Sequence, residues 1–446
     1  MGLCEWMDRS SLIEKFGQNL EPTSLQRTRL WSVADEVCMI LKKVLPQAHC
    51  QVGGSVAKDT WLAERTDIDI FVAFPLKEYA KKSGELCEMV EQGLKKVFMK
   101  STIERLHGSR DYFHFEYKGY TLEIVPIIAI TRADEACNIT DISPLHVAWV
   151  VQEGKRLTNN GKILTNEIRL AKQFCKAQRI YGAESYISGV SGYVVEILVI
   201  YYGSFEKFIE GVAKWKEGQV IDPSLFYAKG MARFNLNSSK MRSPLILIDP
   251  VDKNRNAAAA FGVERWQRLR RVAVAFLKEP SEDFFTAPSY AFSDLVGKVK
   301  SKEKSSKKVS TQKRYLVYLE IEPLCGKVDV VGAKLVKAYD YCMQQLTPFG
   351  IVESDWDWPV GKNAVAYFIV RTKLRPTTQE VQGPPLTMKE ALSAFKTKHA
   401  DNFEKEGRIY ARVKVGYPAL DDQLTAVLGS KYFSEKISRV VGLKLV

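Results

Sequence analysis

Two aspartates stand one residue apart in the segment TDIDIFVAF, at positions 67 and 69. The alternation at the start of this segment predicts a strand, so the carboxylates of Asp67 and Asp69 project from the same face. Neighbouring carboxylates repel each other, and a protein tolerates this mainly where a cation lies between them. Oxygen ligands suit Mg²⁺, which binds one or two protein carboxylates together with substrate phosphates. Glu123, in the segment TLEIVP, supplies a third oxygen ligand if the two strands are neighbours.

A glycine-rich turn precedes this strand. The turn Gly53-Gly54-Ser55 places a flexible backbone and a hydroxyl group at the start of a short predicted helix. Backbone N–H groups there can bind a phosphate, and Lys58 stands about one helical turn further as a counter-charge. By itself the tripeptide indicates a plain tight turn, and an Asp-x-Asp pair is more often a solvated strand face. Together, at this spacing and beside the apolar residues 70–72, they favour the chemical interpretation.

The combined pattern GGSVAKDTWLAERTDID is similar to the signature of the polymerase-beta-like nucleotidyltransferases. The longer segment GGSVAKDTWLAERTDIDIFVAFP resembles the catalytic segment of archaeal-type (class I) CCA-adding enzymes, which are tRNA nucleotidyltransferases. The segments RLAKQFCKAQRIYGAESYISGVSGYVVEILVIYYGSF, IDPVDKNRNAAAAF and FLKEPSEDFF resemble further stretches of that family. This resemblance implies template-independent addition and repair of the 3′-terminal CCA of tRNA from CTP and ATP, with release of pyrophosphate.

The resemblance also implies the site residues. Mg²⁺ is the implied cofactor, and the implied catalytic metal ligands are Asp67, Asp69 and Glu123. The family often has Glu at the first of these positions and Asp at the third, so both acids differ here in length. The implied triphosphate contacts are Ser55, Lys58, His146, Lys172 and Tyr181, and Arg255 is the implied contact to the base. Without the resemblance, His146 would be interpreted as a partly buried structural histidine and Arg255 as an exposed arginine at a helix start.

Two other interpretations stay open. A poly(A) polymerase or oligoadenylate-synthase relative shares the Gly-Gly-Ser and Asp-x-Asp parts, and the stretch DPVDKNRN argues against it. A tRNA-binding protein on an inactive transferase fold would not need clustered negative charge beside RNA, so the three intact carboxylates argue against that alternative.

The elements that must position these residues indicate a multidomain α/β protein with a polymerase-beta-like nucleotidyltransferase head. We expect this head, with a mixed sheet, over residues 1–145, a central helical domain that binds the nucleotide base over 146–275, and a C-terminal α+β body and tail that bind tRNA over 276–446. The segment SPLILIDPVDKNRNAAAAF predicts a strand, a turn and then a helix capped by Asn256. The lysine-rich run over 297–314 predicts a solvated loop.

Composition limits the partners. The 446 residues suffice for about three domains, and 65 Lys and Arg against 52 Asp and Glu give a net charge of +13. This excess favours a polyanionic partner, for which the resemblance implies the tRNA acceptor arm; a homodimer stays open. The eight scattered cysteines indicate reduced thiols and a cytoplasmic protein. The longest apolar run, 193–202, is short for a bilayer span and contains Glu196, so no membrane helix is expected.

Overall fold

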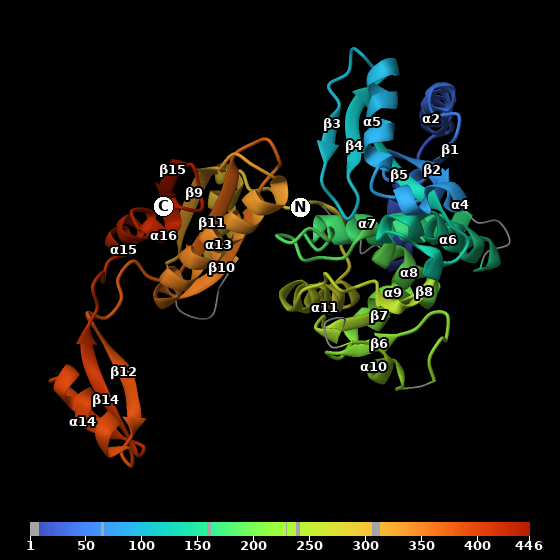
Figure 1. The fold of residues 1–446 in the computed structure, drawn as a ribbon. Helices are drawn as coiled ribbons and strands as arrows, with labels where there is room; N and C mark the ends of the chain where they lie inside the picture. The colour runs from blue at the N-terminus through green and yellow to red at the C-terminus, as the bar shows by residue number, and fades with distance from the viewer. Residues whose placement is uncertain (1–8, 64–66, 158–161, 229, 238–240, 306–312) are drawn as a thin grey trace. The chain divides into compact units, whose positions relative to one another are not determined.

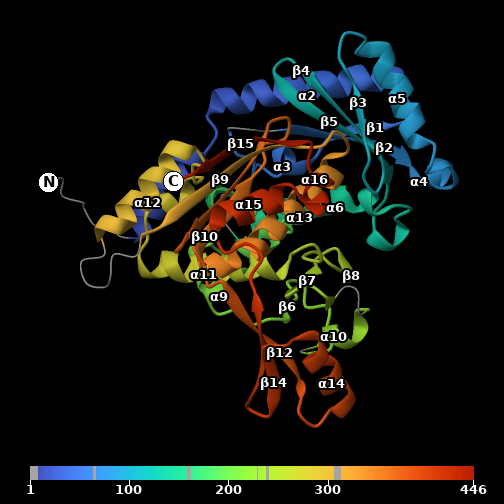
Figure 2. The ribbon, with the colours of Figure 1, turned by 90° about the vertical axis from the view of Figure 1, so that its left-hand side faces the viewer.

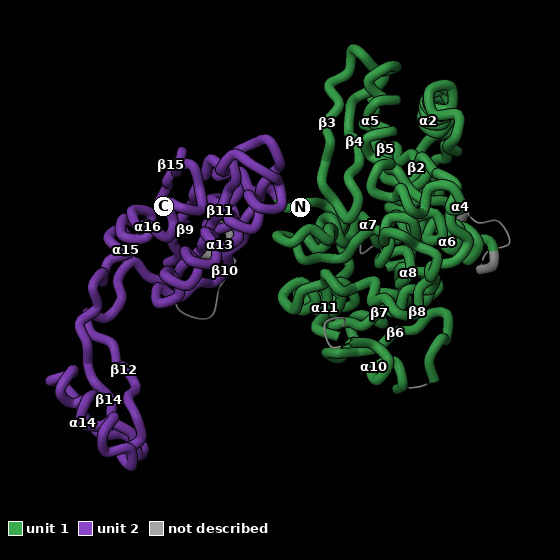
Figure 3. The backbone as a smooth tube through the Cα atoms, viewed as in Figure 1, with its two compact units in different colours: residues 1–288 green, residues 289–446 purple. Residues whose placement is uncertain are grey.

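The computed structural model describes residues 9–63, 67–157, 162–228, 230–237, 241–305 and 313–446. They form two compact units, residues 1–288 and 289–446 (Figure 3). The main boundary therefore follows Pro288, whereas the sequence places a boundary between residues 275 and 276. The division of the first unit into a head and a central domain stays a prediction.

The head contains a five-stranded mixed sheet, as predicted. Its strands lie in the order β1 (His49–Val52), β2 (Asp67–Pro75), β5 (Tyr120–Ala129), β4 (Tyr112–Tyr117) and β3 (Glu104–Leu106). Strands β2 and β5 are parallel, and every other neighbouring pair in this sheet is antiparallel. Helices α2 (Ser24–Val44) and α5 (Leu86–Val97) lie along one face of it (Figures 1 and 2).

The two faces of β2 pack against different parts of the molecule. Ile68, Ile70, Val72 and Phe74 are all fully buried in the core that the sheet forms with α2 and α5. The alternate residues of β2 lie on the opposite face, where Phe71 and Ala73 pack with Val125 and Ile127 of β5. Val147 of helix α6 (Ser143–Leu157) covers this second patch. Asp69 lies on this second face directly before Phe71, so the packing of the apolar patch fixes the position of its backbone.

The middle of the chain is helical around a second core. It contains α1 (Arg9–Leu20), α6, α7 (Lys162–Ala177), α8 (Gly192–Tyr202), α9 (Phe205–Ala213) and α11 (Val263–Lys278). Edge-to-face contacts link Phe174, Phe205, Phe276 and Phe285 within this core. Shorter helices of the first unit are α3 (Gly54–Ala57), α4 (Leu76–Tyr79) and α10 (Ala232–Asn235). Helix α8 is buried from residue 194 to residue 200, so it runs through the centre of this core.

The segment after Pro250 corrects a sequence prediction. Strand β7 (Leu245–Asp249) turns into β8 (Asp252–Asn256), and β6 (Gln219–Ile221) pairs with β7 on its other side. A helix does not start here because the Asn256 side chain accepts the N–H of Leu247 and donates to the carbonyl of Leu245. These bonds hold the chain against β7. The predicted helix cap at Asn256 was wrong, although its side chain also accepts the N–H of Ala258.

The second unit has an α+β architecture, as predicted. One antiparallel sheet has the order β10 (Ile351–Asp357), β11 (Ala364–Val370), β9 (Tyr315–Glu322) and β15 (Arg439–Leu445), and α13 (Val328–Leu346) packs on it. A smaller sheet has the order β12 (Thr378–Pro385), β14 (Arg408–Lys414) and β13 (Asn402–Lys405), next to α14 (Lys389–Lys398). The short helices α15 (Leu420–Leu428) and α16 (Lys431–Ser434) complete it.

The lysine-rich run differs in part from its prediction as a loop. Helix α12 (Phe292–Ser305) covers its first half, because Leu295 and Val299 are buried against the sheet of the second unit. Residues 306–312 of the run lie outside the described residues. In the part of the chain that is described, no helix is long and apolar enough to cross a membrane.

Candidate active site

The predicted carboxylates meet across the parallel strand pair. Asp69 lies directly opposite Glu123 in the register of β2 and β5, and Asp67 lies opposite Thr121. Burial, followed by repulsion from neighbouring carboxylates, raises the pKa of Glu123 to about 8. Burial and the charge of Asp67 also raise the pKa of Asp69, to about 6. The ionised form of both carboxylates is therefore destabilised, and a nearby cation would stabilise it.

This donor set fits a divalent cation. Among the described residues, no three His, Cys, Asp or Glu side chains converge closely enough to form a metal site by themselves. Two facing carboxylates are the protein contribution that is common where water and substrate phosphates complete the coordination of a hard cation. Asp67 is exposed at the start of β2, on the same face, and is available as a further oxygen ligand.

The glycine turn is shaped by its close approach to β2. Gly54 has a φ of +53°, and a Cβ atom there would lie 1.5 Å from Oδ2 of Asp69. A Cβ atom on Gly53 would lie 2.4 Å from the ring of Phe71. The N–H of Gly53 donates to the carbonyl of Asp69 at 2.8 Å, and the backbone N–H of Ser55 donates to the Asp69 carboxylate. Two glycines are required here because no side chain fits.

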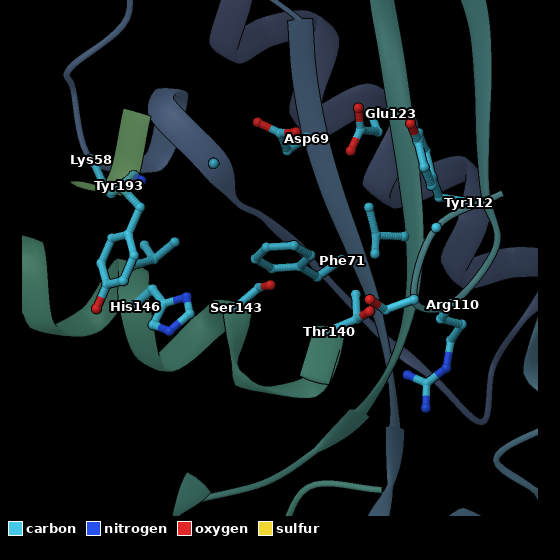
Figure 4. A pocket seen from close by; sticks show the side chains of 15 residues that line it. Lys58, Asp69, Phe71, Arg110, Tyr112, Glu123, Thr140, Ser143, His146 and Tyr193 are labelled. Atoms are coloured by element: carbon cyan, nitrogen blue, oxygen red, sulfur yellow. The ribbon is translucent and has the colours of Figure 1, made fainter. Parts of the chain in front are cut away.

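A cavity of about 350 Å³ opens beside these residues (Figure 4). Asp69, Phe71 and Glu123 line it from the strands β2 and β5. Lys58, His146 and Tyr193 line it from the side of the helices. The cavity thus pairs carboxylates on the sheet with a cation and an imidazole on the helical side, a combination that suits a metal-bound polyphosphate.

A buried carboxylate holds two of the predicted phosphate-binding lysines. Glu196 of α8 is fully buried; its Oε2 accepts from Nζ of Lys58 at 2.6 Å, and its Oε1 accepts from Nζ of Lys172 at 2.7 Å. The hydroxyl of Thr60 also donates to Oε1, at 2.7 Å. Burial alone would raise the pKa of Glu196, but the two lysines outweigh it and hold the pKa at about 2. Burial lowers the pKa of Lys172 to about 8.

A second buried carboxylate joins the residues on the helical side of the cavity. Asp249, at the end of β7, is fully buried, and its Oδ2 accepts from Nε2 of His146 at 3.1 Å and from Nη1 of Arg255. Its Oδ1 accepts from the hydroxyl of Tyr193, also at 3.1 Å. The rings of His146 and Tyr193 stack with centroids 4.0 Å apart. Three elements, α6, α8 and the β7–β8 hairpin, are thus bonded to one carboxylate.

The structure brings the predicted residues into one region in two groups. Those that line the cavity are Lys58, Asp69, Glu123 and His146. The others, which do not line it, are Ser55, Asp67, Lys172, Tyr181 and Arg255. Lys172 lies behind Lys58 on Glu196, and Arg255 reaches His146 through Asp249. Tyr181 is mostly buried, and its hydroxyl lies against Gly192 at the start of α8.

Sequence reasoning assigned no role to three residues of this region, namely Tyr193, Glu196 and Asp249. A signal existed for Glu196, because a lone acid in the run YVVEILVIYY must be paired if the helix is buried. Asp249 and Tyr193 offered no comparable signal. Their importance depends on tertiary neighbours from distant parts of the chain.

Comparisons with known proteins identify related families. Residues 35–133 match the family described as nucleotidyltransferase domain, and residues 166–286 match the family described as tRNA nucleotidyltransferase, second domain. The CCA-adding enzyme of Nanoarchaeum equitans is 34% identical over 389 residues, which are 87% of this chain and 89% of that protein. The CCA-adding enzyme of Sulfolobus acidocaldarius is 32% identical over 336 residues, 73% of each chain. A crystal structure of Cid1 poly(U) polymerase, at 12% identity and a TM-score of 0.49, covers 64% of this chain and 100% of its own, too remote a likeness to bear on the site.

Proposed function

Since this chain belongs to the family of CCA-adding enzymes, we propose that it adds and repairs the 3′-terminal CCA of tRNA from CTP and ATP without a nucleic-acid template. The observation that supports this most directly is the facing pair Asp69 and Glu123, with Gly54 packed against it. The reaction joins the 3′-hydroxyl oxygen of the RNA to the α-phosphorus of the nucleotide, and pyrophosphate leaves with the bonding electrons.

The carboxylates have a defined task in this reaction. Asp67, Asp69 and Glu123 would hold Mg²⁺, which when bound lowers the pKa of the attacking hydroxyl and neutralises phosphate charge. The chain itself supplies placement: the backbone N–H of Ser55 donates to the Asp69 carboxylate, and the N–H of Gly53 donates to the Asp69 backbone carbonyl. Placement of this kind is the main contribution of protein residues to phosphoryl-group chemistry.

The residues on the helical side of the cavity would hold the triphosphate and read the base. Lys58 and His146 reach the cavity directly, and Lys172 adds positive charge behind them. We assign the triphosphate to these residues together with Ser55 and Tyr181. The guanidinium of Arg255 is about one-third exposed while it remains bonded to Asp249, so it can offer further N–H donors to a base.

The C-terminal unit is the part of the chain that we connect with tRNA. We assign tRNA binding to the C-terminal unit and its basic surface, through the shape and phosphates of the acceptor arm. A cytoplasmic location and a homodimer stay predictions. A poly(A) polymerase or oligoadenylate synthase is the alternative, and the family match over residues 166–286 argues against it.

An incorporation assay tests the proposal. Transcripts of one tRNA that end before the CCA, after its first C and after its second C are each incubated with CTP alone and with ATP alone. We expect CTP to extend the first two substrates and ATP only the third, with growth stopping at CCA. Asp69→Asn should reduce the rate at least about 100-fold, because metal-dependent stabilisation is worth several kcal/mol. Long adenylate tails on an unrelated RNA would instead support the alternative.

A further inference from the structure

The protonation of His146 is fixed at one of its two ring nitrogens. Burial alone would raise the pKa of Asp249, but the bonds from His146 and Arg255 hold it at about 2, so this carboxylate is ionised and only accepts hydrogen bonds. Nε2 of His146 lies 3.1 Å from Oδ2 of Asp249 and must therefore carry a hydrogen. The nitrogen that gains or loses a proton is Nδ1.

Nδ1 of His146 is the ring nitrogen that is available to a ligand. It makes no hydrogen bond to any residue that the structure describes, while His146 itself lines the cavity. Burial lowers the pKa of His146 below its ordinary value of 6.5, and the nearby cations Arg255 and Lys58 act in the same direction. Near neutral pH the ring of the empty enzyme is therefore neutral, and Nδ1 carries a lone pair.

A lone pair at this position conflicts with an anionic ligand. Phosphate oxygens are acceptors, so a neutral Nδ1 repels them, whereas a protonated Nδ1 donates a charge-assisted hydrogen bond to them. The groups around the ring favour the change once a polyanion offsets Lys58 and Arg255. Asp249 on β7 remains as a fully buried counter-charge, Tyr193 on α8 stacks on the ring, and Asp69 and Glu123 lie on the sheet side of the cavity.

We propose that binding of a nucleoside triphosphate is coupled to uptake of one proton at Nδ1 of His146, with Asp249 as the counter-ion that permits it. This proposal rests on the proposed function. One N–H bond forms at Nδ1, the proton comes from the acid form of the buffer, and nothing is oxidised or reduced. The ring then bridges two anions, since Nε2–H donates to Asp249 while Nδ1–H donates to the nucleotide.

The coupling has a defined sign. Because the complex holds one proton more than the free enzyme, the affinity for CTP falls as the pH rises between the pKa of His146 in the free enzyme and its pKa in the complex. In that window the dissociation constant rises by up to tenfold per pH unit. Outside it, the dissociation constant is independent of this residue.

Calorimetry of CTP binding tests the coupling on the full-length enzyme in saturating Mg²⁺ at pH 7.5. The heat is measured in MOPS and in Tris, whose ionisation enthalpies differ, and the difference gives the number of protons taken up. We expect net uptake of a substantial fraction of one proton for the wild type. His146→Gln retains a donor for Asp249 but cannot titrate, so the uptake that it loses is the share of His146. Asp249→Asn retains the hydrogen bond without the charge and should reduce uptake while raising the dissociation constant.

A second measurement needs no variant that might fold poorly. The chain has five histidines, and among the described residues His146 alone of them lines the cavity. Its ring ¹³Cε1–¹Hε1 signal, titrated with and without CTP, should show a higher pKa in the complex. Equal heats in both buffers with an unchanged pKa, or the same uptake in His146→Gln, would overturn the coupling. If CTP is still added to tRNA in that case, the proposed function stands; if CTP neither binds nor is incorporated, both fall.

Discussion

Asp69 and Glu123 bind protons more tightly in the folded protein than in the unfolded chain. Burial raises both pKa values, and repulsion from Asp67, and for Glu123 also from Asp69, adds to it. For a carboxyl group with a raised folded pKa, stability is present at low pH and is lost as the pH rises through the folded pKa. Without metal, the free energy of unfolding should therefore fall between about pH 4 and pH 8. The expected loss is several kcal/mol, because one pKa unit corresponds to about 1.4 kcal/mol.

Thermal unfolding in EDTA across this range measures the effect, and excess Mg²⁺ should restore the lost stability at pH 8. Glu123→Gln is the matched control, because it removes the titrating group and keeps the size of the side chain. A melting temperature that stays level from pH 5 to pH 8 in EDTA would contradict the role that we give to repulsion. The same result in Glu123→Gln as in the wild type would place the titration elsewhere.

Arg255 allows a separate test of base selection. Arg255→Ala should weaken use of CTP by about 1.5–3 kcal/mol, the value of a hydrogen bond with a charged partner, and should make UTP and GTP relatively better substrates. Arg255→Lys is the control, because it retains a cation beside Asp249 but loses the planar fork. Both variants are compared by kcat/KM for the four nucleotides. An equal loss with all four would place Arg255 on the phosphates or in the fold.

For single residues, the sequence predicted which residues belong to the site better than it predicted their contacts. The sequence left open whether the strands of Asp69 and Glu123 are neighbours, and the register of β2 and β5 places the two residues opposite each other. The positions of Lys58 and Lys172 on one shared acid were not predicted. A motif specifies what a residue is, whereas the partner of a buried lysine depends on which distant helix supplies the counter-charge.

Among the elements, the glycine turn over β2 gives the sharpest prediction. Gly54→Ala should lower the free energy of unfolding by about 1–3 kcal/mol, from the left-handed φ and the collision with Asp69. Incorporation should fall at least about 100-fold, because the displaced carboxylate leaves Glu123. Gly84→Ala is the control in the same unit, since a Cβ there meets nothing within 4 Å. Chemical unfolding and the incorporation assay measure both effects, and a fully active Gly54→Ala variant would contradict this account.

Element types were predictable where the pattern is periodic. Alternation at its start identified β2 as a strand. The β7–β8 hairpin was not predicted, because the amide of Asn256 bonds to residues of β7 rather than capping a helix. Asparagine side chains serve both purposes, and only the tertiary neighbours decide between them.

On the scale of the whole molecule, charge should govern tRNA binding. With a net charge of +13, the affinity for tRNA should fall steeply with salt, and the slope of log K against log salt counts phosphate contacts at about 0.7 to 0.9 each. Filter binding between 50 and 300 mM KCl measures it. A nearly flat slope would show that phosphates contribute little.

The lysine-rich run calls for a substitution rather than a deletion in this test. Removal of residues 298–308 would also remove Val299, which is buried in the second unit, and Lys298, which pairs with Glu353. Lys300 is exposed, so Lys300→Gln removes charge without loss of packing. We expect a change of less than about threefold in tRNA affinity, because a single exposed charge contributes little. The boundary at Pro288 depends on contacts between distant residues, which no local sequence pattern reports.

The parallel pairing of β2 and β5 also determines when the carboxylate pair forms during synthesis and folding of the chain. Strand β2 carries Asp69, and α4, α5, β3 and β4 all lie between it and the strand that carries Glu123. A parallel partner needs such a crossover, and closing it has an entropy cost that a hairpin avoids. During synthesis from the N-terminus, Asp69 therefore emerges first and has no facing carboxylate until β5, with Glu123, has also emerged. A nascent or truncated head ending before β5 presents a glycine turn and two aspartates but no facing acid, so an unfinished chain has no complete site with which to sequester nucleotide.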